Sequence, residues 1–254
     1  MAPRIHVKFS RKGGVGKSFL AFSMAAVTAQ VLGTNRDGDP KVAIASADPQ
    51  STPLWRAAQL ANVPFDTIDI SDDVENIYRL KDLPYTNIFV DTPGWTPPSL
   101  VEYEEGANPL GKDARITQIL EAILEQADDA MVPMLCERDC FEPTEVTIDW
   151  VLKPRGIPYT VVINKYLPGK EESYVEGTRM WCARKGFVVA NTAVRRYRVH
   201  ANGDRLVTDY HSNRAELQAR MDITNLAMEH GLTRAAHLVQ QLEAQDREMT
   251  EERR

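Results

Sequence analysis

The sequence predicts an α/β fold in which a doubly wound, mostly parallel sheet carries helices on both faces. Apolar, β-branched runs alternate with segments of helical spacing along most of the chain. In the run NIFV at residues 87–90, three consecutive apolar residues follow Asn87, as expected of a central strand that is buried on both faces. A glycine-rich stretch, SRKGGVGKSFL at residues 10–20, joins the first predicted strand to the first predicted helix. These observations favour a sheet with a phosphate-binding loop at its edge.

The predicted elements follow one another at short intervals. Strands are expected at residues 5–10, 41–47, 67–70, 87–90, 130–135, 159–163 and 187–190. Helices are expected at residues 17–31, 53–61, 114–126 and 144–152, and from residue 214 onward. Right-handed crossovers then gather the loops that follow the strands at one edge of the sheet, namely residues 12–18, 48–52, 91–94 and 164.

The chain is divided into two predicted parts. Residues 1–231 are predicted to form one large α/β domain that carries the glycine-rich loop, and residues 232–254 a C-terminal helix and charged tail. The polar segment 95–113 interrupts the strand–helix alternation, and we expect it to be either a surface loop or a lid over the site.

Composition excludes several classes of protein. The 254 residues are 43% hydrophobic and 26% charged, which is ordinary for a globular protein, and no apolar run approaches the ~18 residues of a membrane span. A signal-peptide pattern is absent, and three cysteines are too few for a disulfide scaffold, so we expect a cytoplasmic protein. The net charge of −6 argues against a surface that is basic throughout, although it permits a local basic patch.

The glycine-rich loop departs from the common phosphate-binding pattern in two places. That pattern is G-x-x-x-x-G-K-[ST], and here Arg11 replaces the opening glycine while Lys12 adds a second lysine. The remaining glycines let backbone N–H groups turn inward at the start of a helix, where they bind phosphate; the alternative is a glycine-rich turn without a ligand. The predicted nucleotide-binding residues of the loop are Gly13, Gly14, Val15, Gly16, Lys17, Ser18 and Phe19.

Two aspartates end predicted strands where a phosphate-transfer site needs carboxylates. Asp91 follows the apolar strand, and together with the Ser18 hydroxyl it is predicted to hold Mg²⁺; otherwise it caps a turn. Asp48 ends the preceding strand in the sequence ADPQST, where it is predicted to orient the attacking water; otherwise Asp48-Pro49 simply forms a turn.

The motifs together resemble those of the deviant-Walker-A ATPases of the ParA/MinD group. The signature x-K-G-G-x-G-K-[ST] matches residues 11–18, and the resemblance extends to ADPQS at 47–51, VDTPG at 90–94 and VINK at 162–165, so it covers most of residues 4–230. It departs from the group at Ser46, where many relatives carry a second aspartate, and at Phe19, where they often carry a small polar residue.

The resemblance implies a site shared between two subunits. Two ATP molecules would be sandwiched in a homodimer, and Lys12 would cross the interface to the partner's nucleotide. Lys17 and Asp48 would complete the catalytic set, and Asn164 would bind the adenine; Asn164 otherwise acts as a turn residue. The implied cofactors are ATP and Mg²⁺.

A cluster of arginines indicates which branch of the group the chain resembles most. The predicted DNA-binding residues are Arg195, Arg196, Arg198, Arg205 and Arg214. Such a cluster suits sequence-independent contact with double-stranded DNA; the alternative is an arginine-rich turn that is solvated or paired with Asp204, Asp209 and Glu216. The resemblance to partition ATPases then implies a ParB-like centromere-binding partner and a nucleoid-associated location.

Other members of the group fit the sequence less well. A membrane-binding tail needs a cationic face and bulky apolar side chains, whereas residues 232–254 mix acidic and basic residues, so no membrane partner is expected. Cys136, Cys140 and Cys182 are expected to be free cysteines, not cluster ligands. A dimeric positioning switch of the MinD-like kind, acting on a protein cargo without DNA, remains the alternative function, and a metabolic P-loop enzyme lacks a visible motif for its second substrate.

Overall fold

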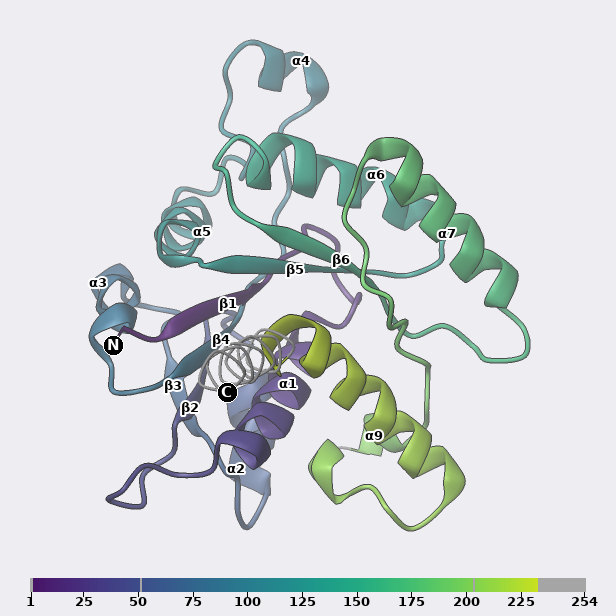
Figure 1. The fold of residues 1–254 in the computed structure, drawn as a ribbon. Helices are drawn as coiled ribbons and strands as arrows, with labels where there is room; N and C mark the ends of the chain where they lie inside the picture. The colour runs from purple at the N-terminus through teal and green to yellow at the C-terminus, as the bar shows by residue number, and fades with distance from the viewer. Residues whose placement is uncertain (1, 51, 203, 233–254) are drawn as a thin grey trace, which may run out of the picture.

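A computed structural model describes residues 2–50, 52–202 and 204–232 of the chain. Its sheet has six strands in the order β3-β2-β4-β1-β5-β6, and every pair of neighbouring strands is parallel. Helices α1, α2 and α9 cover one face of this sheet, and α5, α6 and α7 cover the other (Figure 1). The predicted fold class is confirmed.

The strands are β1 (Arg4–Lys8), β2 (Val42–Ser46), β3 (Asp66–Asp69), β4 (Asn87–Asp91), β5 (Asp129–Met134) and β6 (Tyr159–Ile163). The α-helices are α1 (Lys17–Leu32), α2 (Thr52–Gln59), α3 (Val74–Tyr78), α4 (Leu100–Glu104), α5 (Ala114–Gln126), α6 (Arg138–Val146), α7 (Glu172–Lys185), α8 (Val199–Asn202) and α9 (Arg214–Ala227). Shorter helical turns are η1 (Arg79–Asp82), η2 (Thr147–Leu152), η3 (Val207–Asp209) and η4 (Met228–Leu232).

Two hydrophobic cores lie on opposite faces of the sheet. Alternate residues of β1 and the segment after it, Ile5, Val7 and Phe9, belong to the core shared with α5 and η2. The other core is built around α1, which is buried along most of its length because it lies between the sheet and α9. This explains why α1 is rich in alanine and has no polar face. The two cores fix β1 and α1, the elements that flank the glycine-rich loop.

One predicted strand is wrong. Residues 187–190 form no strand, because only Val189 pairs with Val161, as a single parallel bridge. The cause lies 38 residues farther along the chain: the carboxylate of Glu229 accepts hydrogen bonds from the backbone amides of Asn191 and the residue after it. Those two amides do not pair with β6, which interrupts the ladder until Val194 donates to the carbonyl oxygen of Ile163 at 2.8 Å.

Two helical segments also differ from the prediction. Helix α6 begins at Arg138, six residues before the predicted start at residue 144, and continues directly into η2. The segment 95–113 contains α4, which the sequence analysis did not predict, with a capping box formed by Ser99 and Glu102. The ring of Tyr103 stacks on Trp150 of η2, with 4.1 Å between ring centroids, so this segment is packed against the domain.

The predicted tail, residues 232–254, lies outside the described residues except for its first position. Among the helices that are described, none is long and apolar enough to cross a membrane. All three cysteines are free, and Cys140 and Cys182 are buried.

Candidate functional site

The carboxyl edge of the sheet brings together the loops that the sequence analysis singled out. In the strand register Asp91 lies beside Lys8 on one side and beside Ser46 on the other. The glycine-rich loop, the Asp48 turn and the segment after Asp91 therefore begin at the same level, as expected of parallel strands.

The glycine-rich loop has a backbone that only glycine adopts readily. Gly14 has φ of +76° and Gly16 has φ of +97°, in the left-handed region. Gly16 is the N-cap of α1, and no side chain accepts a hydrogen bond from the first turn of that helix. The start of α1 thus presents free backbone N–H groups and a positive dipole end, as anion-binding loops do.

A hollow of about 550 Å³ lies over this loop. It is lined by Gly13, Gly14, Gly16, Lys17, Ser18, Phe19, Asp48, Gln50, Thr52, Gly94 and Lys165. Six of the seven predicted loop residues therefore face one cavity. The exception is Val15, which is buried and contributes its carbonyl group to a hydrogen bond described below.

Lys17 lies at the base of the hollow. Its ammonium group is near the carbonyl oxygen of Lys12, at 3.4 Å. Burial lowers the pKa of Lys17, while the carboxylates of Asp91 and Asp48 act in the opposite direction. A buried cation beside a ring of backbone N–H groups is suited to hold a polyphosphate.

Asp91 is fully buried, and within the described residues neither of its carboxylate oxygens makes a hydrogen bond of normal geometry. Burial raises the pKa of Asp91 to about 6, with the Ser18 hydroxyl and the Lys17 ammonium lowering it in part. The hydroxyls of Ser10 and Ser46 at the same edge are also buried without a hydrogen-bond partner in the described chain. Orphaned oxygen atoms of this kind fit a hydrated divalent cation, so the residues present suit Mg²⁺.

Asp48 forms the turn that the sequence analysis gave as its alternative role, and it also faces the predicted site. Its Oδ1 accepts a hydrogen bond of 2.9 Å from the backbone N–H of Gln50, which closes a turn after β2. Asp48 also lines the hollow over the glycine-rich loop. The turn holds the carboxylate at the cavity wall, and its part in hydrolysis stays a prediction.

Asn164 is fixed against the glycine-rich loop. Its Nδ2 donates a 2.7 Å hydrogen bond to the carbonyl oxygen of Val15, while its Oδ1 is buried without a partner in the described chain. Because Nδ2 is engaged, the amide cannot flip, and Oδ1 remains an acceptor. A side chain at Gly16 would meet Nδ2 at 2.3 Å, so this contact requires the glycine.

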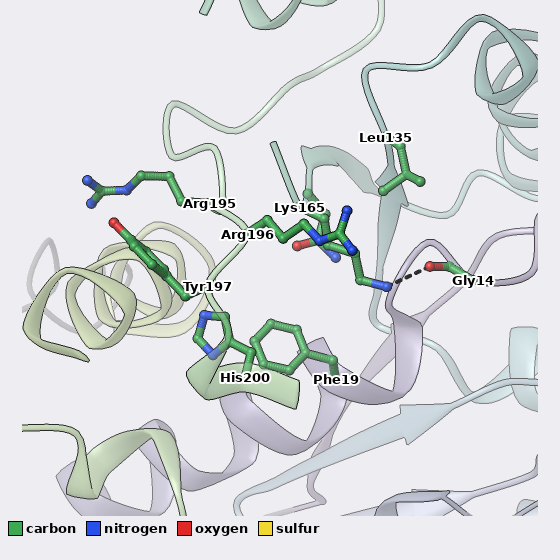
Figure 2. A pocket seen from close by; sticks show the side chains of 9 residues that line it. Gly14, Phe19, Leu135, Lys165, Arg195, Arg196, Tyr197 and His200 are labelled. Carbon is green, nitrogen blue, oxygen red and sulfur yellow. Dashed lines mark hydrogen bonds between the residues drawn. The ribbon is translucent and has the colours of Figure 1, made fainter. Parts of the chain in front are cut away.

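A second hollow, of about 420 Å³, opens beside Asn164 (Figure 2). It is lined by Gly14, Phe19, Leu135, Asn164, Lys165, Arg195, Arg196, Tyr197 and His200. Phe19 and His200 place their rings together, with 4.5 Å between centroids. The two hollows share Gly14, Phe19 and Lys165. A phosphate-sized cavity next to a cavity with an aromatic wall has the layout of a nucleotide site.

Lys12 is held within its own chain. Its ammonium donates a 2.5 Å hydrogen bond to Asp139 at the start of α6, and this contact raises the pKa of Lys12 and lowers that of Asp139. The side chain is one-third exposed. Reaching a second subunit would require Lys12 to leave Asp139.

The predicted DNA-binding arginines do not share one environment. Arg195 forms a 2.6 Å ion pair with Asp222, whose side chain is 7% exposed. Arg205 pairs with Glu216 at 2.8 Å. These two guanidinium groups hold the segment before α9 onto that helix, so the alternative of paired arginines applies to them. Arg196, Arg198 and Arg214 are exposed.

Several lining residues were missed by the sequence analysis. Lys165, Tyr197 and His200 line the second hollow, and Gln50 and Thr52 line the first. Two of these residues lie inside motifs that the sequence analysis quoted: Lys165 in VINK, and Gln50 in ADPQS. Thr52, Tyr197 and His200 lie outside those motifs, and no motif marked them as lining residues.

Comparison with solved structures identifies the fold. MinD cell division protein from Aquifex aeolicus has a TM-score of 0.61 and 17% identity, covering 89% of this chain and 96% of its own. A putative plasmid partition protein from Borrelia burgdorferi, bound to AMPPNP, has a TM-score of 0.57 and 14% identity, covering 90% and 99%. This chain has the fold of the ParA/MinD-type P-loop ATPases.

Further solved structures share the fold and carry nucleotides. MinD from Pyrococcus horikoshii, complexed with Mg-ADP, has a TM-score of 0.60 and 17% identity, covering 91% of this chain and 97% of its own. No protein-family model matches the sequence, and no curated protein matches it with significance.

Proposed function

We propose that this protein is an ATP-hydrolysing switch of the ParA type, which dimerises with ATP and binds DNA without sequence preference. The observation that carries the proposal is the hollow over the glycine-rich loop, which that loop lines together with Lys17, Ser18 and Asp48. The buried carboxylate of Asp91 lies behind it, close enough to Ser18 and Lys17 to interact with both. Lys12, next to Gly13 in the same loop, supports a site completed by a second copy.

The chemistry proposed for this site is electrostatic. Backbone N–H groups at the start of α1 and the ammonium of Lys17 bind the phosphate oxygens and neutralise charge that grows there during transfer. Ser18 and Asp91 are the residues that would hold Mg²⁺, which when bound would further neutralise the phosphate charge. Asp48 orients the attacking water at the cavity wall. Asn164 presents a fixed acceptor that suits the exocyclic amino group of adenine and repels the carbonyl oxygen of guanine.

DNA binding is proposed for the exposed members of the arginine cluster. Arg195 and Arg205 serve ion pairs within the chain, and Arg196 lines the second hollow, so phosphate contact is assigned to Arg198 and Arg214. A ParB-like partner would stimulate hydrolysis and release the DNA.

The test is binding to random duplex DNA with ATP and Mg²⁺ over a series of salt concentrations. The double variant Arg198→Ala with Arg214→Ala is expected to weaken binding for all sequences and to reduce the salt slope by about 2, since each phosphate contact contributes roughly one. Arg36, an exposed arginine in the loop after α1, is the matched control, and Arg36→Ala should leave the slope unchanged. An ATP-bound protein without affinity for DNA at low salt would contradict the partition role.

A MinD-like switch that acts on a protein cargo is the second candidate. It is favoured by the intrachain pairing of Arg195 and Arg205, which removes two cations from the predicted DNA surface. The same salt series separates the candidates, because this switch would dimerise with ATP and ignore DNA.

A further inference from the structure

Lys165 has an unusual backbone conformation at the junction of the two hollows. Among the described residues other than glycine, it alone has a positive φ, of +59°. Residues with a side chain seldom adopt this conformation, and where they do the surrounding structure holds them there, often at a binding site. Lys165 directly follows Asn164, which is anchored to the glycine-rich loop, and precedes Tyr166, whose backbone pairs with Arg195.

This conformation directs the Lys165 side chain onto the glycine-rich loop. Its ammonium donates a 2.7 Å hydrogen bond to the carbonyl oxygen of Gly14, drawn as a dashed line in Figure 2. The residue as a whole is exposed, whereas its ammonium end lies in the rim shared by both hollows.

A second cation, Arg196, lies close to Lys165. The backbone N–H of Arg196 donates to the carbonyl oxygen of Tyr166 at 2.8 Å, which fixes residue 196 next to the residue that follows Lys165. The side chain of Arg196 extends toward Lys165 across the second hollow, while Arg195 and Tyr197 point the other way (Figure 2). Burial and the positive charge of Arg196 both lower the pKa of Lys165.

Neither cation has an ion-pair partner among the described residues, and the carboxylate of Glu137 acts on Lys165 without contacting it. By contrast, Arg195, next to Arg196 in sequence, is paired with Asp222. Two like charges that approach each other at the rim of a cavity favour an anion between them. The rim lies between the hollow suited to the terminal phosphates and the hollow with the aromatic wall.

We propose that Lys165 and Arg196 bind the α-phosphate of the nucleotide, the group that joins the two hollows. The inference rests on the proposed nucleotide-binding function and adds two residues to the site. It also reassigns Arg196 from the predicted DNA surface to the nucleotide. On binding, the Lys165 ammonium exchanges the Gly14 carbonyl for a phosphate oxygen. The hydrogen bond between Lys165 and the glycine-rich loop is therefore broken when the nucleotide is bound.

The test is isothermal titration calorimetry of the full chain with two probes, AMPPNP and inorganic tripolyphosphate, each with Mg²⁺. Lys165→Gln and Arg196→Gln are each expected to weaken both probes by about tenfold or more, the typical effect of losing a charged hydrogen bond. Lys165→Arg should restore most of the affinity because it keeps the charge. Lys170→Gln, which removes an exposed lysine from the same loop, should change the affinity by less than about twofold.

The outcomes separate this inference from the function on which it rests. Loss of binding in Lys17→Ala together with unchanged binding in Lys165→Gln and Arg196→Gln overturns the α-phosphate contact and leaves the P-loop function standing. A loss confined to AMPPNP, with tripolyphosphate unaffected, assigns the pair to the nucleoside and also overturns the contact. Failure of the wild-type protein to bind either probe refutes the nucleotide site itself.

A purely structural role for Lys165 is tested by Lys165→Gly. Glycine accepts the positive φ, so removing the side chain relieves the strained backbone while losing the bond to Gly14. We expect the thermal midpoint to stay level or rise while AMPPNP affinity falls about tenfold. A lower midpoint with unchanged affinity would show that the lysine serves the fold alone.

Discussion

Three glycines in one loop allow backbone strain and steric conflict to be measured separately. Gly13 has neither problem: its φ is not positive, and a methyl group would meet nothing within 4 Å. Gly14 has φ of +76° with open space around it. Gly16 has φ of +97°, and its methyl group would lie 2.3 Å from Nδ2 of Asn164. Alanine should therefore introduce neither cost at position 13, backbone strain alone at position 14, and both strain and a steric conflict at position 16.

The expected losses of unfolding free energy form a series. Gly13→Ala should cost less than ~0.5 kcal/mol, as surface substitutions do. Gly14→Ala should cost about 1–2 kcal/mol, the penalty of the left-handed conformation. Gly16→Ala adds the loss of the buried bond between Asn164 and Val15, about 1–3 kcal/mol, for a total near 2–5 kcal/mol.

Urea unfolding monitored by circular dichroism measures all three variants against the wild type. Equal midpoints for Gly16→Ala and Gly13→Ala would refute the placement of Asn164 against the loop. If Gly14→Ala and Gly16→Ala lower the free energy of unfolding equally within error, the contact between residue 16 and Asn164 is relieved without cost.

Two further predictions concern the segment beside the second hollow. Burial and the nearby Arg56 lower the pKa of His200 to about 4, so below pH 6.5 the unfolded chain takes up a proton that the folded chain refuses. As pH falls from 6.5 to 4, the free energy of unfolding of the wild type should fall by up to about 3 kcal/mol more than that of His200→Phe, as measured by urea unfolding. If the difference in free energy between the two proteins does not change with pH, the ring is not buried in its neutral form. Asp222→Asn should cost roughly 2 kcal/mol, less than a fully buried pair because Arg195 is 22% exposed. The exposed pair of Lys153 and Asp149 is the control, and Asp149→Asn should lower the free energy of unfolding by less than ~0.5 kcal/mol. If Asp222→Asn and Asp149→Asn lower it equally, the pair of Arg195 and Asp222 is no more shielded from solvent than the control pair.

The elements that the sequence predicted correctly are those determined by local pattern. The middle of β4, Ile88 to Val90, is apolar because it is buried on both faces, and α1 follows its glycine loop directly. The short helix α4 carried a readable signal as well, since Ser99 and Glu102 have the spacing of a capping box. That signal was overlooked because the surrounding segment is polar and rich in proline.

Features that depend on distant partners were beyond the sequence. Glu229 accepts hydrogen bonds from the amides after residue 190, which do not pair with β6, and nothing near residues 187–190 indicates it. Likewise, no local pattern distinguishes Arg195, which is paired with Asp222, from Arg196, which has no ion pair among the described residues. The glycine-rich loop and Asp91 could be predicted because each directly follows a strand that the sequence itself indicates. The structure places both at the same edge of the sheet.

The most direct test of the central claim is the molar mass of the protein in solution, measured by light scattering with and without ATP and Mg²⁺. The account predicts that the wild type dimerises with ATP, and that Lys12→Ala binds ATP while remaining monomeric. Asp139→Asn, which frees Lys12 from its partner in the same chain, should dimerise at lower protein concentration than the wild type. If Lys12→Ala dimerises as the wild type does, the loop is an ordinary one-subunit site and the account is wrong.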